Sequence, residues 1–344
     1  MSHQKNIRIG IVGVGFGQHV HVPAFRSQPH YEVRAICASN QQRAMEVANR
    51  LSIPNAFGNW RELVEDDEID AISIATPPAL QGEIAMAALE NRKSVFCEKP
   101  LCDSIDKAEA LLKKAEVCGA AHMVDFIFPE IAEWAKAKQL LEAGVLGRVR
   151  HFTVSWQIET YAEHMGLDSW KTRLVEGGGT LNLFVSHIFY YLEWLFGPIA
   201  GLSCHMFGSR TSFSSLTVEF QSGASGSICV NSNAFLGSGH NLEIYGEDGT
   251  LFLQNPSSDY VRGFQLRLGT RISKQLQQIE LLSPTSTYSD GRVAMVSQLV
   301  RRFLSWIETH QPQHPNMKDG LRVQRLLEAA RRSNQSSCWI KEPF

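Results

Sequence analysis

The sequence predicts an α/β domain with a parallel sheet, followed by an α+β domain with a large, mostly antiparallel and open-faced sheet. Over the first 120 residues, short apolar runs alternate with helical patterns, which is typical of a parallel sheet covered by helices on both faces. After residue 122, strand-like runs follow one another through short turns. Because 344 residues exceed the usual size of a single core, we expect two domains, residues 1–122 and 123–344.

In the first domain, strands are predicted at apolar runs and helices at the stretches between them. The strands are residues 7–12, 33–37, 71–75 and 95–97, and the helices are residues 41–51, 81–90 and 104–118. In the last helix, Ala108, Leu111, Leu112 and Ala115 form one apolar stripe at the spacing i, i+3, i+4 and i+7.

In the second domain, a helix is predicted at residues 130–143, ended by Gly144. Strands are predicted at residues 149–157, 201–207, 215–220, 226–232, 241–245 and 250–253. The segments QSGAS and GEDGT lie between consecutive strands and indicate hairpin turns, so their flanking strands are expected to be antiparallel. Two helices close the chain, one through Met295, Leu299, Phe303 and Trp306, the other through Val323, Leu326, Leu327 and Ala330.

Composition excludes several classes of partner. The net charge of −2 lacks the basic excess of nucleic-acid-binding proteins, and no apolar run reaches the roughly 18 residues of a membrane span. The N-terminal segment lacks a secretory signal, and the seven cysteines form no CxxC pair. We therefore expect a cytoplasmic protein with reduced thiols.

A glycine-rich turn follows the first predicted strand. Gly13, Gly15 and Gly17 fit a G-x-G motif before a helix, with Gln18 where the strict G-x-G-x-x-G pattern has its last glycine. In a βαβ unit, such glycines allow a tight turn and close approach of a pyrophosphate, whose oxygens meet N–H groups of the following helix. The turn, with Phe16 inside it, therefore predicts a dinucleotide site.

The end of the second predicted strand favours NADP over NAD. NAD-binding domains usually carry a carboxylate about 20 residues beyond the glycines, where it binds the ribose. Here the position is Ala38, which leaves space, and Ser39 and Asn40 offer hydrogen-bond donors. Arg43 would reach a 2′-phosphate. The alternative is that Arg43 is only a solvated helix residue.

Further motifs, in this order, carry a family resemblance. They are TPP at residues 76–78, CEKP at 97–100, GVLG at 144–147, WK at 170–171, GGGTL at 177–181 and DGLRV at 319–323. With the glycine-rich turn, the chain resembles the Gfo/Idh/MocA family of NAD(P)-dependent oxidoreductases over nearly its whole length. The resemblance implies a Rossmann domain, a second domain with an open antiparallel sheet, and a substrate site in the cleft between them. Members of the family typically oxidise or reduce a carbinol carbon of sugars, inositols or related polyols.

Lys99 is the predicted proton carrier. It follows the carboxyl end of a parallel strand, where open α/β sheets bind ligands, and Pro100 restricts the backbone after it. Oxidising a hydroxyl requires a proton acceptor, and a lysine beside a positively charged nicotinamide releases its proton more readily. The resemblance assigns Glu98 to the cofactor site and Lys99 to proton transfer. A surface EKP turn is the alternative.

The second half of the site departs from the family pattern. Many members carry D-x-x-x-H after the glycine turn, and here these positions are Leu183 and His187. A second acidic position is Tyr190, and Gln81 stands where a histidine often follows the TP motif. Asn182 is next to Leu183 but points about 100° away on an α-helix. We expect His187 to assist Lys99, unless it is a core histidine.

The expected site residues fall into three groups. The catalytic residues are Lys99 and His187. The cofactor-binding residues are Gly13, Gly15, Phe16, Gly17, Ser39, Asn40, Arg43, Thr76, Pro77, Glu98 and Lys99, and the substrate-binding residues are Lys99, Trp170, Asn182 and His187. No metal site is expected, and His19 and His21 are interpreted as helix-surface or cofactor-proximal residues. Trp156, Tyr161, His164 and Trp170 either line a sugar pocket or pack in the core.

The predicted function is hydride transfer between NADP, or NAD, and a carbinol or carbonyl carbon of a sugar, polyol or related small molecule. Two alternatives stay open. One is a non-catalytic NAD(P)-binding sensor or scaffold, since both family carboxylates are missing, and the other is an NAD(P)-dependent glycosidase. We also expect a homodimer or homotetramer that pairs through the antiparallel sheet, because a one-sided sheet exposes a face.

Overall fold

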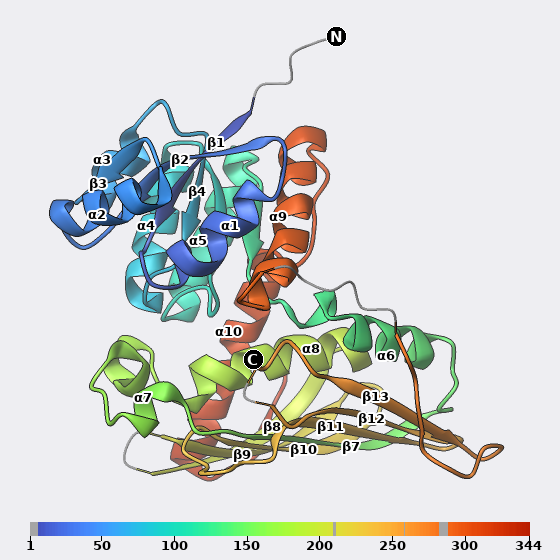
Figure 1. Ribbon diagram of the computed structural model, residues 1–344. Helices are drawn as coiled ribbons and strands as arrows, with labels where there is room; N and C mark the ends of the chain where they lie inside the picture. Colours follow the sequence, from blue (N-terminus) through green and yellow to red (C-terminus); the bar gives the residue numbers. More distant parts are fainter. Residues whose placement is uncertain (1–5, 209–210, 258, 282–287) are drawn as a thin grey trace. The chain divides into compact units, whose positions relative to one another are not determined.

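The computed structural model describes residues 6–208, 211–257, 259–281 and 288–344, which form two compact units (Figure 1). The described part of the first unit is residues 6–127 and 288–324. The second unit contains the described residues from 128 to 281 and residues 325–344. The domain limits expected from the sequence, 1–122 and 123–344, stay a prediction.

The first unit is built on a six-stranded parallel sheet in the order β3-β2-β1-β4-β5-β6. Its strands are β1 (Ile7–Val12), β2 (Tyr31–Cys37), β3 (Asn55–Phe57), β4 (Ala71–Ile74), β5 (Ser94–Cys97) and β6 (His122–Val124). All four residues of the central strand β4 are buried, as expected when helices cover both faces. The predicted parallel α/β architecture is confirmed; the short strands β3 and β6 were not predicted.

Several helices of the first unit begin at a side chain that caps the first turn. They are α1 (Val22–Arg26), α2 (Gln41–Leu51), α3 (Trp60–Glu65), α4 (Pro78–Glu90), α5 (Ile105–Cys118) and α9 (Arg292–Thr309). The Ser104 hydroxyl accepts a hydrogen bond from the Lys107 N–H at 3.3 Å, and Gly119, with φ +65°, ends the same helix α5. The late helix α9 belongs to this unit, since Tyr31 donates a hydrogen bond to the Val300 carbonyl.

The second unit is built on a nine-stranded sheet in the order β14-β13-β12-β11-β7-β10-β9-β8-β15. Its strands are β7 (Val149–Gln157), β8 (Ile199–Phe207), β9 (Phe213–Phe220), β10 (Ser225–Asn231), β11 (Gly239–Gly246), β12 (Gly249–Asn255), β13 (Gln265–Thr270), β14 (Gln277–Gln278) and β15 (Ile340–Lys341). Strands β7 and β10 are parallel, whereas the other neighbours are antiparallel. The mostly antiparallel sheet and both predicted hairpins are confirmed.

Helices α6 (Ala132–Glu142) and α8 (Ser186–Phe196) lie over one face of this sheet in Figure 1. Strand β9 alternates buried and exposed residues, as a strand with one covered face does. The long helix α10 (Met317–Ser336) begins in the first unit and ends in the second, where Ser333 accepts a hydrogen bond from the Cys204 N–H at the sheet edge. Along the described chain, no helix has the length and apolar character needed to cross a bilayer.

Candidate active site

The glycine-rich turn lies at the carboxyl end of β1. Gly13 has φ +109°, and a Cβ there would lie 2.2 Å from the Ala75 carbonyl oxygen, so no other residue fits. A Cβ on Gly15 would meet no atom within 4 Å, which leaves the backbone open to a ligand. The chain then enters a π-helical turn, η1 (Gly17–His21), that leads into α1.

Gln18 stands where the strict G-x-G-x-x-G pattern has its last glycine, and its side chain is hydrogen-bonded at both ends of its amide. Its amide donates a hydrogen bond to the Val14 carbonyl and accepts one from Arg50 of α2. The substituted position therefore links the turn to α2.

The carboxyl end of β2 carries Ser39, Asn40 and Arg43. The Asn40 side chain accepts a hydrogen bond from the Arg43 N–H at 2.9 Å and caps α2. The side chains of Ser39 and Arg43 are exposed. Both residues therefore offer exposed polar groups at this strand end.

Thr76 and Pro77 follow β4. Pro77 is the residue before the first turn of α4, and the Thr76 hydroxyl oxygen is buried. Within the described residues, that oxygen has no hydrogen-bond partner, which is costly for a buried hydroxyl. A bound dinucleotide could supply the partner that this hydroxyl lacks.

The EKP loop, which follows β5, is held in place by hydrogen bonds from Gln81 of α4. The Gln81 amide is buried and donates to the carbonyl oxygens of Pro100 at 2.8 Å and Leu101 at 3.1 Å. The Lys99 N–H donates to the Glu98 carboxylate at 3.2 Å. Gln81, which differs from the family pattern, thus fixes the segment that carries Lys99.

A buried group of four polar side chains adjoins this loop. The His21 ring is fully buried, with Nδ1 2.7 Å from the Ser73 hydroxyl and Nε2 3.3 Å from Glu98 Oε1. The same Nε2 lies 3.6 Å from Asp125 Oδ2. Of the two interpretations of His21, the helix-surface one is therefore wrong, and the cofactor-proximal one stays a prediction. His19 is exposed.

The protonation of this group follows from its burial and its charges. Burial disfavours a charged imidazole, but the contacts with Asp125 and Glu98 outweigh burial and raise the pKa of His21 to about 9. Burial and the Glu98 charge raise the pKa of Asp125 to about 7. Burial also acts to raise the pKa of Glu98, yet the contacts with His21 keep the pKa of Glu98 below its ordinary value.

Among the described residues, one cluster has the spacing that could hold a metal ion. It consists of His21, Glu98 and Asp125, whose possible ligand atoms lie within 4.8 Å of one another. Each contact of the imidazole is, however, at hydrogen-bond or ion-pair distance. We therefore describe the group as hydrogen-bonded.

His187 lies in the second unit, in the first turn of α8. It is buried, and its ring centroid is 5.2 Å from Phe128 and 6.4 Å from Trp156. The preceding turn is tight, since a Cβ on Gly178 would lie within 2.5 Å of the Lys171 and Trp170 carbonyl oxygens. The backbone of the half-buried Trp170 therefore packs directly on the turn that leads to His187.

Asn182 is engaged inside the second unit. It lies in a π-helical turn, η5 (Leu181–Val185), where its amide donates to the Gly177 carbonyl at 3.0 Å. Its amide oxygen accepts from Arg331 of α10 at 2.8 Å. Arg331 therefore braces this turn from α10.

The other aromatic candidates separate into core and surface. Trp156 is buried and stacks on His240 with ring centroids 4.1 Å apart, so its core interpretation is confirmed. Burial lowers the pKa of His240 to about 3 and keeps that ring neutral. Tyr161 is exposed, and the exposed His164 contacts Glu159 at 3.0 Å.

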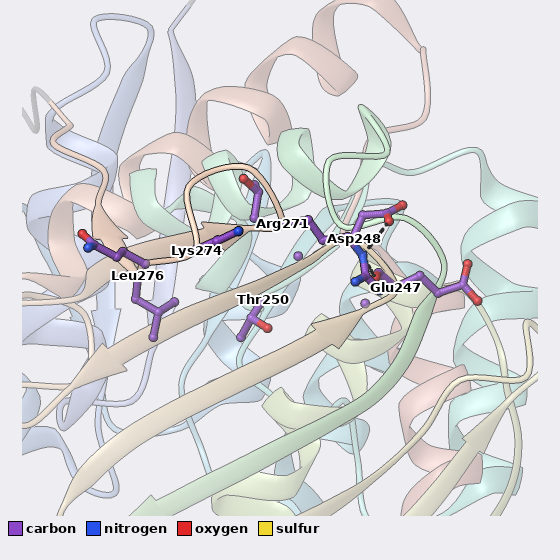
Figure 2. A pocket seen from close by; sticks show the side chains of 11 residues that line it. Glu247, Asp248, Thr250, Arg271, Lys274 and Leu276 are labelled. Carbon is purple, nitrogen blue, oxygen red and sulfur yellow. Dashed lines mark hydrogen bonds and ion pairs between the residues drawn. The ribbon is translucent and has the colours of Figure 1, made fainter.

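A shallow hollow on the second unit lies at the β11–β12 hairpin (Figure 2). Three of its charged side chains form ion pairs: Arg271 with Asp248 at 3.2 Å, and Glu247 with Arg148 and Arg150. The predicted site residues do not line this hollow. We therefore do not assign the active site to it.

Two family profiles match this chain. Residues 7–126 match the Gfo/Idh/MocA profile described as an oxidoreductase family with an NAD-binding Rossmann fold, and residues 138–341 match the C-terminal alpha/beta domain of the same family. An uncharacterized oxidoreductase of Synechocystis sp. is 29% identical, with 100% of this chain and 98% of that protein aligned.

Levoglucosan dehydrogenase of Pseudarthrobacter phenanthrenivorans is 29% identical over 58% of this chain and 53% of that protein. A solved structure of levoglucosan dehydrogenase in complex with NADH and levoglucosan superposes with a TM-score of 0.90 at 22% identity. It covers 99% of this chain and 100% of that one. At that identity, the likeness shows a common fold.

Proposed function

Because this chain belongs to the Gfo/Idh/MocA oxidoreductase family, we propose that it is an NAD(P)-dependent dehydrogenase or reductase acting on CH–OH groups. Its substrate is a sugar, polyol or related small molecule with a carbinol or carbonyl carbon. The observation that carries the proposal is the edge of the parallel sheet. There the open backbone of Gly15, the orphaned Thr76 hydroxyl and the braced Lys99 follow β1, β4 and β5.

The cofactor site is assigned to this edge. Gly13, Gly15, Phe16 and Gly17 would hold the pyrophosphate, and Thr76, Pro77 and Glu98 would hold the nicotinamide end. When bound, the nicotinamide supplies hydride acceptance or donation. We propose a preference for NADP, supported by the exposed Ser39 and Arg43 and by Ala38 in place of a carboxylate. Asn40 contributes through its capping of α2.

Lys99 is assigned to proton transfer. In the direction of oxidation its amine takes the hydroxyl proton of the substrate while the hydride leaves the same carbon, and in reduction it returns that proton to the carbonyl oxygen. The hydrogen bonds from Gln81 hold the loop that carries Lys99. Because the loop is held, Lys99 needs less movement to reach the substrate.

His187 is assigned to assisting at the substrate hydroxyl, and Trp170 to substrate contact. The aromatic neighbours of His187, which are Phe128 and Trp156, restrict the position of its imidazole ring. His187→Ala should reduce turnover and weaken substrate binding together. Asn182, whose amide is engaged by Gly177 and Arg331, acts through the turn rather than by touching the substrate.

The test is a screen of polyols and keto-sugars with both cofactors, followed by nicotinamide absorbance. With an active substrate, Lys99→Ala should lower turnover by about 10²-fold or more while cofactor affinity changes much less. The matched control is Lys107→Ala, which removes an exposed lysine paired with Asp103. An unchanged turnover in Lys99→Ala would refute the assignment.

The same screen separates the other functions. Tight cofactor binding without turnover of any substrate would favour a sensor or scaffold. Hydrolysis of a glycoside without net reduction of the cofactor would favour a glycosidase.

A further inference from the structure

The buried imidazole of His21 has no part in the mechanism proposed above, yet it touches the residue next to Lys99. It lies on η1, between the rings of Phe16 at 5.2 Å and Phe96 at 5.4 Å, both edge to face. Its two nitrogens face Ser73 on one side and Glu98 with Asp125 on the other. Aromatic rings and hydrogen bonds therefore fix it in both position and orientation.

We propose that His21 is a positioning residue for Lys99, acting through Glu98. It holds the Glu98 carboxylate against the Lys99 N–H, and its positive charge offsets the Glu98 charge, which lowers the stabilisation that Glu98 gives to the protonated lysine amine. This inference rests on the proposed function, because it deepens the role given to Lys99.

The geometry connects His21 to Lys99 in two contacts. Glu98 uses one carboxylate oxygen, Oε1, to meet His21 Nε2 at 3.3 Å. It uses the other, Oε2, to accept the Lys99 N–H at 3.2 Å. A carboxylate held at both oxygens has one side-chain conformation, so the backbone of Lys99 is fixed by the same contact that fixes Glu98.

The charges around His21 explain why it is a cation. Glu98 and Asp125 face Nε2, and the neutral Ser73 hydroxyl faces Nδ1. Lys99 also acts on Glu98 and lowers its pKa. Arg292 of α9 has its guanidinium 4.9 Å from the centre of the Phe16 ring, and it pairs with Asp290 at 2.6 Å. Since the carboxylates adjoin the imidazole directly, the pKa of His21 is raised to about 9 and the ring stays protonated at neutral pH.

Removing that charge would strengthen the hold of Glu98 on the lysine. Without the imidazolium, burial acts to raise the pKa of Glu98, and the charge of the Lys99 ammonium then opposes that rise. The charged carboxylate and the protonated lysine therefore stabilise each other more strongly than in the presence of His21. A lysine that keeps its proton cannot accept one from a hydroxyl. His21 is therefore expected to set the pH at which Lys99 becomes a base.

The experiment compares wild type with His21→Gln, in which an amide replaces the imidazolium. The matched control is His122→Gln: His122 is also buried in this unit, where it accepts the Met317 N–H and has no contact with Glu98. The fraction of unprotonated Lys99 is measured by pH-dependent trace acetylation with acetic anhydride and peptide mass spectrometry. This readout needs no substrate and no turnover.

In His21→Gln, the midpoint for Lys99 labelling should move up by about one pH unit or more, with no movement in His122→Gln. With an active substrate, the acidic limb of the pH profile of kcat/KM for oxidation should move up by the same amount. At neutral pH, turnover should fall about tenfold and recover at higher pH.

Three results would overturn the inference: an unmoved Lys99 midpoint in a folded His21→Gln protein, an equal shift in the His122→Gln control, or a stoichiometric metal ion that elemental analysis finds in wild type and not in His21→Gln. Failure of the proposed function has a different signature. In that case labelling shifts as expected, but wild-type protein turns over no substrate.

Discussion

Single residues that depart from the family pattern acquire a structural explanation. Gln81 replaces a frequent histidine and donates to the carbonyls of Pro100 and Leu101, and Arg331 holds Asn182 at 2.8 Å. The sequence indicated Lys99 and the glycine turn because their signals are local motifs. It could not indicate Asp125 or Arg331, because their partners are distant in the chain and only the folded chain brings them together.

Leu183 tests the missing carboxylate directly. It is half-buried one turn before His187, so Leu183→Asp would place a partly desolvated charge there. We expect lower turnover of the native substrate and a loss of about 1–3 kcal/mol in the free energy of unfolding, with Leu183→Asn as the uncharged control. A gain of activity towards ordinary polyols would instead indicate a degraded form of the common site.

His122 gives a prediction for acid stability. Burial lowers its pKa from 6.5 to about 4, so its contribution to stability is present above pH 6.5 and is lost as the pH falls towards 4. Between pH 7 and 4.5, urea unfolding of wild type should lose about 2–3 kcal/mol more than that of His122→Gln. Equal losses in the two proteins would show that His122 does not titrate in this way.

Elements with clear boundaries in sequence were predicted well. The limits of α2 coincide with the prediction because Asn40 caps its first turn, and the alternating pattern of β7 gives the same limits as observed. The short β3, β14 and β15 have two or three residues each, too few for any periodicity to be seen. The π-helical turns η1 and η5 were missed, because a helical pattern does not distinguish them from an α-helix.

The start of α2 bears on cofactor preference. Arg43 is exposed in its first turn, where an arginine can bind a 2′-phosphate with charge-assisted hydrogen bonds. Arg43→Ala should weaken NADP binding about tenfold and NAD binding much less. The exposed Gln42 of the same helix, changed to alanine, is the control for general damage, and fluorescence titration measures both affinities. An intrinsic preference of wild type for NAD by tenfold or more would contradict the assignment.

For the whole chain, the order of the two architectures was predictable and the pairing of distant segments was not. The hairpins of β9–β10 and β11–β12 follow from local turns, whereas the parallel pair β7–β10 joins strands that are not consecutive. Likewise, the periodicity of α9 indicated a helix, but its packing beside Tyr31 depends on contacts between the two ends of the chain.

The nine-stranded sheet also bears on assembly. The outward residues of β9 include Ser215, Thr217 and Glu219, and Ser227 is outward on β10, so this face has few charges. Such a face is suited to pairing with another copy. Sedimentation equilibrium should show a dimer or tetramer at micromolar concentrations, and replacing Thr217 by lysine should shift it towards monomer. A monomer at all concentrations would refute pairing.

The central claim is net hydride exchange between a nicotinamide and a substrate carbon, and isotope transfer tests it most directly. Wild-type protein is given an active keto-sugar and reduced cofactor deuterated at the nicotinamide C4 on the transferred face, in unlabelled water. The account predicts one deuterium on the new carbinol carbon for each cofactor oxidised, with the rate reduced about 10²-fold in Lys99→Ala. A carbinol without deuterium, or a product formed without oxidation of the cofactor, would contradict it.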